Sequence, residues 1–316
     1  MRDIVWRSGR WKSKEFKNWI NEFSPEVVLL MAHNYSYSFK IALEIVKKKK
    51  IPLVVYNCED YYLKKGNKFS PIYMVYEGAF KRAYKKTMKE AAHVIYNSKM
   101  LQNSYAKEFE NKSSVMYMPT ELKPCANKKE NSVFTVSYLG NFGNGRHEVL
   151  IEVANTLKKI DNNIIFNAYG EIKNEGIREV IEACSAINYK GFVSYDRAQE
   201  VMYTSDLLVH VENFGEFYRS DLKHGFTTKI SDCLASGTCF FVYAPEDIAG
   251  VQYLIENDAT CVCSKPEELF SKLNDIVNNK SLRNNYIGKA LDIASINHNK
   301  ELICKSFHDV IISIIE

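Results

Sequence analysis

The chain has 316 residues, of which 46% are apolar and 13% aromatic, so its composition predicts a folded protein with two packed domains. The 42 Lys and Arg against 38 Asp and Glu leave a net charge of only +4, which argues against a nucleic-acid partner. The eight cysteines lack metal-binding spacing, and no export signal or membrane-spanning run occurs, so we expect a reduced, cytoplasmic chain.

In the first half, short runs rich in strand-forming residues alternate with helical patterns, which is typical of a parallel sheet covered by helices. These runs predict an N-terminal Rossmann-like domain over residues 1–127. An apolar helical stripe between Leu302 and Ile315 predicts that a C-terminal helix, 298–316, packs back on this domain. The expected strands are 27–31, 53–56, 93–96 and 114–118.

The segment 71–91 has an apolar, aromatic side and a basic opposite face. Such a helix suits the anionic surface of a membrane, as a lipid-linked acceptor would require. Alternatively, the apolar side faces the core and the lysines are simply solvated.

Residues 119–131 are polar, include two prolines and lack periodicity, so we interpret them as a linker. A second domain, 128–297, follows, and its strands predict a doubly wound sheet. Ligand is expected in the cleft between the two domains, outside the carboxyl ends of both sheets. The expected strands are 133–139, 164–169, 187–191, 207–211, 238–243 and 260–263.

A glycine-rich loop, 140–146 (GNFGNGR), connects the first of these strands to a helix. Its glycines let backbone N–H groups approach a phosphate, and Arg146 enters at the positive end of the helix. Gly140, Asn141 and Arg146 are therefore candidates for binding a phosphorylated ligand. A plain turn is the alternative, since the order is not G-x-G-x-x-G.

The most informative segment is 226–245 (FTTKISDCLASGTCFFVYAP). Lys229 and Asp232 lie three residues apart near the start of a short helix, so both side chains emerge on one face. The ammonium suits a diphosphate and the carboxylate suits sugar hydroxyls, with Thr228 adjacent. Gly237 ends the helix before a buried strand. A surface helix with an ion pair is the alternative.

This segment resembles the donor-site signature of family 4, retaining, GT-B-fold glycosyltransferases, in which a Lys-x-x-Glu helix and Leu-Ala-x-Gly precede a strand. Residues 188–212 and 253–273 resemble the flanking regions of that family. The resemblance implies an α/β fold of two Rossmann-like domains. It also implies that Lys229 and Arg146 neutralise a diphosphate, although the family's second basic residue in the loop is missing, and that Asp232 holds a ribose.

The resemblance adds further donor-side candidates. Gly170 lies in a turn like the family's Tyr-Gly-x-Gly, although an ordinary turn is equally compatible. The backbone of Phe192 and Val193 corresponds to positions that hold the nucleoside base. His224 takes the place of a glutamate that touches the transferred sugar, with Glu216 as a second choice and an exposed loop histidine as the alternative.

Two further residues, His210 and Glu212, end a strand on the side expected to face the ligand. We expect strand alternation to point them to opposite faces of the sheet, so that one of them faces the donor. A surface role for both is an equally good interpretation.

On the acceptor side, 54–60 (VVYNCED) resembles the strand and loop where many relatives have His-Asp. Asp60 matches, Glu59 replaces the histidine, and His33 follows an earlier strand. These side chains are candidates for binding acceptor hydroxyls or moving a proton, with a solvated loop as the alternative. No D-x-D motif follows a strand, so we expect no metal and no cofactor besides the substrate.

Family members open with a strand and a glycine-rich loop that we do not find before the first helix, so we expect a reduced N-terminal sheet. A late start of the reading frame, a fragment, and a subgroup with a smaller acceptor domain all remain open.

The sequence thus predicts a retaining, metal-independent glycosyltransferase that moves a sugar from a nucleotide diphosphate to a glycan or lipid-linked acceptor. We expect it in the cytoplasm, in surface polysaccharide or glycoconjugate synthesis, with a peripheral position at the inner face of the membrane as the alternative. A truncated, donor-binding but inactive subunit and a nucleotide-sugar epimerase or hydrolase are the alternatives.

Overall fold

A computed structural model describes residues 5–6, 8–64, 70–125 and 131–316. Within these ranges the chain divides into two compact units. Unit 1 comprises the residues up to Tyr117 together with Ile303–Glu316, and unit 2 comprises Met118–Leu302. The predicted boundary at 127/128 and residues 126–130 of the predicted linker lie outside the described residues, so the predicted domain limits stay predictions.

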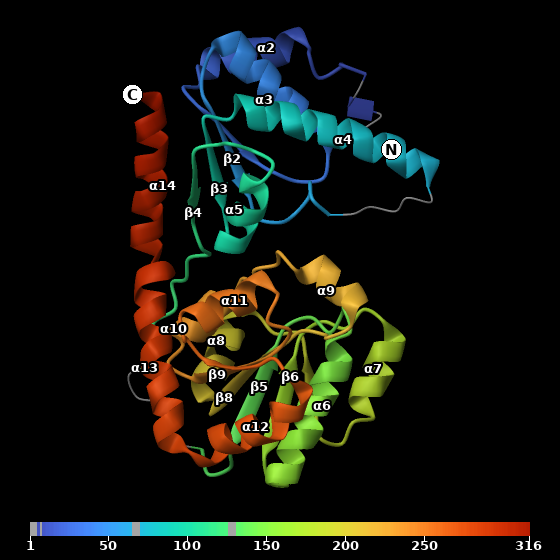
Figure 1. Cartoon of the computed structure of the whole chain (residues 1–316), viewed down its shortest axis with the longest axis vertical. Coiled ribbons are helices and arrows are strands. Elements are labelled where there is room, and N and C mark those ends of the chain that lie inside the picture. The colour runs from blue at the N-terminus through green and yellow to red at the C-terminus, as the bar shows by residue number, and fades with distance from the viewer. Residues whose placement is uncertain (1–4, 7, 65–69, 126–130) are drawn as a thin grey trace. The chain divides into compact units, whose positions relative to one another are not determined.

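Unit 1 contains a parallel sheet in the order β1-β2-β3-β4, with helices between its strands (Figure 1). The four predicted strands are confirmed, apart from small differences at their ends. The elements in chain order are α2 (Lys14–Phe23), β1 (Val28–Met31), α3 (Ser36–Lys49), β2 (Leu53–Asn57), α4 (Pro71–Glu90), β3 (His93–Tyr96), α5 (Lys99–Ala106) and β4 (Ser113–Val115).

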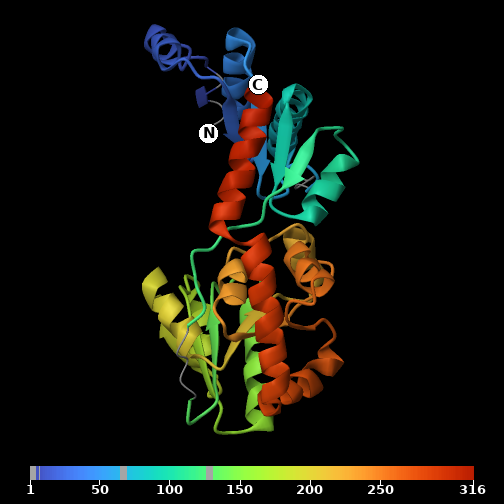
Figure 2. The same ribbon diagram turned by 90° about the vertical axis from the view of Figure 1, so that its left-hand side faces the viewer.

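The sheet of unit 1 is covered on both faces because alternate strand residues point to opposite sides. Leu53 and Val55 pack with residues of α3 and α4 on one face. Val54 and Ile95 pack on the other face against apolar side chains of helix α14 (Lys300–Ile315), which Figure 2 shows alongside the strands. The apolar stripe of the C-terminal segment therefore has a partner.

Ser70 is the N-cap of helix α4, and its hydroxyl accepts a hydrogen bond from the Tyr73 amide. Pro71 follows in the first turn of the helix. Its later apolar residues, such as Phe80 and Tyr84, are buried, so the core-facing interpretation holds for this part. Ile72, at the start of the helix, is 84% exposed. Membrane contact through 71–91 stays a prediction.

Unit 2 contains a parallel sheet in the order β10-β9-β8-β5-β6-β7, and all six predicted strands are confirmed. The first elements are β5 (Thr135–Leu139), α6 (Arg146–Ile160), β6 (Ile165–Tyr169), α7 (Glu175–Glu182), β7 (Asn188–Gly191), α8 (Tyr195–Thr204) and β8 (Leu207–Val211). They are followed by α9 (Glu216–Leu222), α10 (Lys229–Ala235), β9 (Cys239–Tyr243), α11 (Ala249–Glu256), β10 (Cys261–Cys263), a 3-10 turn (Pro266–Glu268), α12 (Leu269–Asn278) and α13 (Lys280–Asn297).

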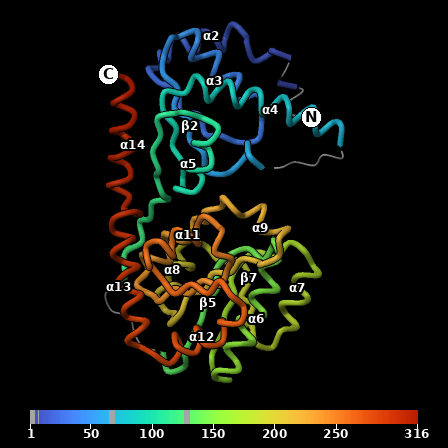
Figure 3. Tube along the Cα trace, in the orientation of Figure 1, coloured from blue at the N-terminus to red at the C-terminus, as the bar shows by residue number. Residues whose placement is uncertain are grey.

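From β5, successive strands are added on one side as β6 and β7 and then on the other side as β8, β9 and β10. The topological switch point of this doubly wound sheet therefore lies between β5 and β8. Helices α6 and α12 pack together over one face of the sheet (Figure 3), where Val136, Val209 and Phe241 are buried. The alternate residues Leu208 and Phe240 are buried as well, so the opposite face is also covered.

The two sheets and their helices make the chain an α/β protein, and the N-terminal sheet is the smaller one, as predicted. In the part of the chain that the structure describes, no helix has both the length and the apolar character needed to cross a bilayer.

Candidate functional site

A pocket of about 690 Å³ lies in unit 2, outside the carboxyl ends of β5, β6 and β7. This is where ligands bind in doubly wound sheets. The wall includes most of the predicted donor-binding residues: Gly140, Asn141, Gly170, Phe192, Val193, Thr228, Lys229 and Asp232.

Two glycines form one wall of the pocket because their backbones touch. A methyl group on Gly170 would lie 1.7 Å from the carbonyl oxygen of Gly140, and the φ of Gly170 is +148°. A methyl group on Gly140 would lie 2.2 Å from Lys229 Nζ. Gly170 therefore requires glycine because the backbone of Gly140 leaves no room for a side chain, whereas a side chain at Gly140 would have to displace the Lys229 ammonium.

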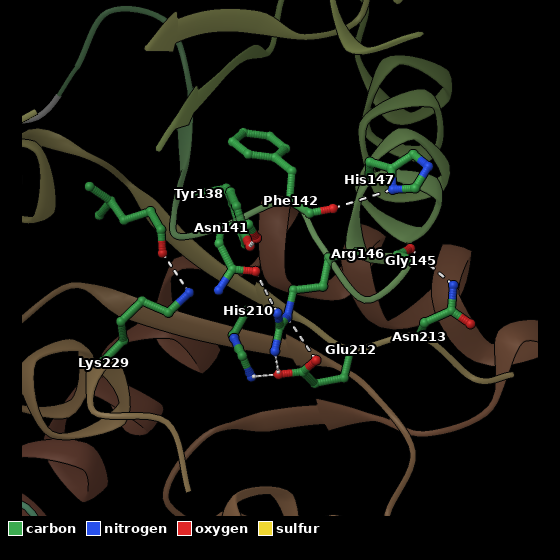
Figure 4. A network of polar contacts seen from close by, with 11 residues as sticks. Tyr138, Asn141, Phe142, Gly145, Arg146, His147, His210, Glu212, Asn213 and Lys229 are labelled. Carbon is green, nitrogen blue, oxygen red and sulfur yellow. Dashed lines mark hydrogen bonds and ion pairs between the residues drawn. The ribbon is translucent and has the colours of Figure 1, made fainter. Parts of the chain in front are cut away.

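Lys229 reaches from the start of α10 into this wall (Figure 4). Its Nζ donates a hydrogen bond of 2.6 Å to the carbonyl oxygen of Leu139 and lies 4.8 Å from the centre of the Tyr138 ring. No carboxylate within the described ranges lies within ion-pair distance of this ammonium, so the ion pair with Asp232, which was the alternative interpretation, does not form. Burial lowers the pKa of Lys229 to about 8.

Arg146 does not line the pocket but forms a buried ion pair behind it. Its Nε lies 2.8 Å from Glu212 Oε2, and a second guanidinium nitrogen donates to Glu212 Oε1 at 2.8 Å. A third nitrogen donates to Asn141 Oδ1 at 2.6 Å, as Figure 4 shows. Arg146 thus ties the glycine-rich loop to the end of β8.

His210 belongs to the same cluster, and the expectation that it faces away from Glu212 is wrong. Residues two apart on a strand share a face, and His210 Nε2 lies 3.3 Å from Glu212 Oε1. Burial lowers the pKa of His210, so its ring is neutral and donates a hydrogen bond from Nε2 to the carboxylate. Burial alone would raise the pKa of Glu212. The contacts with His210 and with the Arg146 guanidinium outweigh this effect and hold the pKa of Glu212 below its ordinary value.

Asp232 is held by two hydroxyl groups that sequence reasoning missed. Thr120 donates to Asp232 Oδ1 at 2.5 Å, and Tyr195 donates to Oδ2 at 3.3 Å. Burial raises the pKa of Asp232, and these hydrogen bonds oppose the rise. Thr120 lies in the predicted linker, where no local pattern signals a contact with residue 232.

The remaining donor-side candidates differ in their placement. Phe192 lines the pocket and is 77% exposed, with Val193 beside it. His224 lies in the loop between α9 and α10, is half-buried and is not part of the pocket wall. Glu216, the second choice for that role, begins α9.

The acceptor-side candidates lie in unit 1, beyond the ends of β1 and β2. Asp60 is tied into its own loop, since its Oδ1 accepts hydrogen bonds from the Tyr105 hydroxyl at 2.9 Å and the Leu63 amide at 2.8 Å. His33 Nδ1 accepts a hydrogen bond from the Tyr35 amide at 2.9 Å. Glu59 is exposed. Their roles stay predictions.

Within the described ranges, no three His, Cys, Asp or Glu side chains are grouped so that they can hold a metal ion.

No protein-family model matches the sequence, and no curated protein matches it.

Solved structures resemble the whole chain at low sequence identity. Sucrose-phosphate synthase from Thermosynechococcus elongatus is 12% identical with a TM-score of 0.68, and the match covers 94% of this chain and 76% of that one. A glycosyltransferase from Rickettsia africae ESF-5 is 14% identical with a TM-score of 0.70, covering 96% and 80%. Anabaena HepE, in complex with UDP and glucose, is 15% identical with a TM-score of 0.66, covering 94% and 80%.

These neighbours are GT-B glycosyltransferases, and two parallel-sheet units of this kind are what the resemblance predicted. The assignment to family 4 in particular stays a prediction. The chain has the GT-B fold.

Proposed function

We propose that the protein is a glycosyltransferase that transfers a sugar from a nucleotide-diphosphate donor. The observation that carries this proposal is the Lys229 ammonium, which lies in a pocket at the carboxyl ends of a doubly wound sheet without a carboxylate partner among the described residues. A cation that is partly desolvated and unneutralised needs an anion, and a diphosphate meets that need.

The pocket wall suggests how the donor is held. Lys229 faces the diphosphate, and the close contact of Gly140 with Gly170 lets backbone approach it. Asp232, oriented by Thr120 and Tyr195, accepts hydrogen bonds from the ribose hydroxyls. Arg146 contributes by fixing Asn141 rather than by touching the phosphates directly.

The nucleoside end of the pocket is formed by Phe192 and Val193, whose backbone we propose as the base-binding strip. His224, outside the wall of this pocket, is the candidate for touching the transferred sugar. The Anabaena HepE structure contains UDP and glucose, which supports a sugar nucleotide as the donor class.

The reaction that we propose retains the anomeric configuration, as the family resemblance implies. It is independent of metal in this proposal, because Lys229 and the backbone amides offset the charge that develops on the leaving diphosphate. The acceptor is a glycan or a lipid-linked glycan, bound on the side of Asp60, Glu59 and His33, in the synthesis of a surface polysaccharide or glycoconjugate. A peripheral position at the inner membrane face, through α4, belongs to the same proposal.

Calorimetric titration with a panel of nucleotide sugars and their nucleotide diphosphates tests the proposal. We expect Lys229→Ala to weaken the best ligand by on the order of 2 kcal/mol or more, because a charge-assisted contact is lost. Lys289→Ala removes an exposed lysine paired with Asp258 and serves as the matched control. Unaltered affinity in Lys229→Ala would remove the diphosphate assignment.

Product analysis separates the proposed enzyme from its two rivals. Incubation with the donor that binds best, a glycan acceptor and a chelator should release nucleotide diphosphate and form a new glycosidic bond. Binding without turnover identifies an inactive donor-binding subunit. Conversion of the sugar nucleotide without an acceptor identifies an epimerase or a hydrolase.

A further inference from the structure

A second large pocket, of about 960 Å³, lies in unit 1 and is separate from every residue discussed as donor or acceptor site. It is formed by helices α3 and α4 and by the segment that precedes α2, the blue and cyan parts of Figure 1. Its floor consists of Leu43, Ala79 and Ala83. Small side chains at the contact of the two helices leave the hollow open between them. A hollow of this size is large enough for several sugar or phosphate units.

The wall of this pocket is strongly basic. Six of its side chains are Lys or Arg and only one, Glu44, is acidic. We call this site the basic pocket. Residues four apart on each helix point into it together, which explains why two helices supply most of the charge. The six cations are Lys12, Lys40, Lys47, Lys48, Arg82 and Lys86.

Most of this charge is not neutralised by the protein. Lys12 pairs with Glu44 at 2.6 Å, and Lys47 pairs with Glu90 at 3.0 Å. The other four cations form no ion pair with any residue in the described part of the chain. Like charges held close together on two helices destabilise each other unless an anion lies between them.

An aromatic wall borders the cations on one side. Trp6 and Trp11 line the pocket. The Trp6 ring stacks on Tyr37 with 4.9 Å between the ring centres, and Lys12 Nζ lies 5.2 Å from the centre of the Trp11 ring. Fixed aromatic faces beside cations are suited to a ligand that has both ring structures and negative charge.

We propose that the basic pocket binds an anionic glycan chain that carries phosphate or carboxylate groups at repeated positions. The repeated cations match repeated anions, the volume matches several units, and the tryptophan rings contact the apolar faces of sugar rings. A lipid surface fits the observations less well, because a flat bilayer does not enter a hollow between two helices. The inference that this glycan is the acceptor of the transferred sugar rests on the proposed function, whereas the inference that the glycan binds here does not.

The three tryptophans of the chain, Trp6, Trp11 and Trp19, give the experiment its signal. In a Trp19→Phe background, only the two tryptophans of the pocket remain to report binding. We expect an oligogalacturonate and a phosphomannan fragment to change the fluorescence saturably, and a neutral maltooligosaccharide of the same length to leave it unchanged. No nucleotide sugar is added, so failure here is distinguishable from failure of the proposed function.

Matched double variants on one helix locate the site. Arg82→Ala with Lys86→Ala should weaken binding roughly tenfold or more, because both side chains line the pocket. Lys85→Ala with Lys89→Ala removes the same charge from exposed positions of α4 outside the wall, and should weaken binding less than about twofold. The thermal midpoints of both variants should match that of the parent.

Three outcomes overturn the proposal. Equal weakening by the two double variants would indicate diffuse attraction to a basic surface. Equal binding of the neutral maltooligosaccharide would indicate that charge is irrelevant. Tighter binding of phosphatidylglycerol vesicles or single-stranded RNA than of either anionic glycan would assign the charge to another class of partner.

Discussion

The two pockets present positive charge in opposite ways. In unit 2, one ammonium, that of Lys229, is partly buried against a carbonyl and an aromatic ring. In unit 1, six cations line a wider hollow, and Lys12 and Lys47 are each almost half exposed. Both arrangements attract anions, but water and salt weaken the second far more than the first.

This difference teaches how much supporting structure each site requires. A single desolvated cation must be held in place, and the buried pair of Arg146 with Glu212 and the contact of Gly140 with Gly170 provide this support. Exposed cations need only a helix to carry them. We therefore expect substitutions of supporting residues to be costly around the first pocket and nearly neutral around the second.

The largest contrast should come from the two acidic partners. Glu212→Gln leaves the Arg146 charge buried and unpaired, and we expect it to reduce the free energy of unfolding by about 3–5 kcal/mol. Glu44→Gln removes the partner of Lys12 at the basic pocket, where we expect a change within about 1 kcal/mol. The side chains of the first pair are 11% and 4% exposed and those of the second 46% and 41%, which is the basis of this contrast.

Urea denaturation followed by circular dichroism measures both variants under the same conditions. Equal destabilisation by the two substitutions would show that burial does not distinguish the pairs. Glu212→Ala with Arg146→Met removes both charges, and it should recover part of the stability lost in Glu212→Gln.

The next contrast uses one glycine from each pocket. Gly170→Ala places a methyl group 1.7 Å from the Gly140 carbonyl oxygen, whereas Gly9→Ala, at φ +74° in the basic pocket, meets no atom within 4 Å. We expect Gly9→Ala to cost about 1–2 kcal/mol from backbone strain alone. Gly170→Ala should cost more than that and also abolish nucleotide binding, since the wall must shift.

Thermal unfolding and calorimetric titration on the same samples test this. A Gly170→Ala protein that binds nucleotide as tightly as the parent would show that the contact between the two glycine backbones does not shape the donor site.

The sequence was sufficient for the fold because the strands are short, most of them are largely buried, and turn residues bound them. All ten strands in the described part of the chain were predicted, including the two that flank the switch point, β5 and β8. Parallel topology brings the ends of such strands together, so Gly140, Lys229 and Asp232, found from local patterns, and Gly170, found from the family resemblance, line one pocket.

Contacts that depend on packing between distant segments could not be predicted in this way. The partners of Asp232 lie at residues 120 and 195, far apart in the chain, and neither has a local signal. From the sequence, only the basic face of the segment 71–91 pointed to the basic pocket, because the pocket forms where α3, α4 and the segment before α2 come together. The error for His210 and Glu212 was one of strand periodicity and was avoidable.

The pH dependence of nucleotide binding sharpens the comparison further. Burial lowers the pKa of Lys229 to about 8, from an ordinary value of 10.5. Since a diphosphate needs the charged ammonium, we expect the affinity to fall by up to about tenfold per pH unit above pH 8. The free energy of unfolding of the ligand-free protein should rise between about pH 8 and 10.5, because in this range the unfolded chain binds more protons at this lysine than the folded chain does.

Comparison with Lys229→Met isolates this group from other groups that titrate in the same range. The difference in affinity between parent and variant should shrink as the pH rises through 8. A constant difference up to pH 10 would mean that the Lys229 ammonium of the ligand-free protein keeps its proton up to that pH and that burial does not lower its pKa. Anion binding by the basic pocket, measured in the same buffers, should depend instead on salt.

The smallest effect that we expect concerns Asp232 and tests whether it acts on the ribose. Thr120→Val removes the hydroxyl that donates to Asp232 Oδ1 and keeps the shape of the side chain, so we expect a loss of about 1 kcal/mol in nucleotide affinity. Pyrophosphate lacks a ribose, and its affinity should stay the same in the variant. If pyrophosphate and nucleotide weaken together, Thr120 supports the Lys229 wall instead, and the division of the pocket into a diphosphate end and a ribose end is wrong.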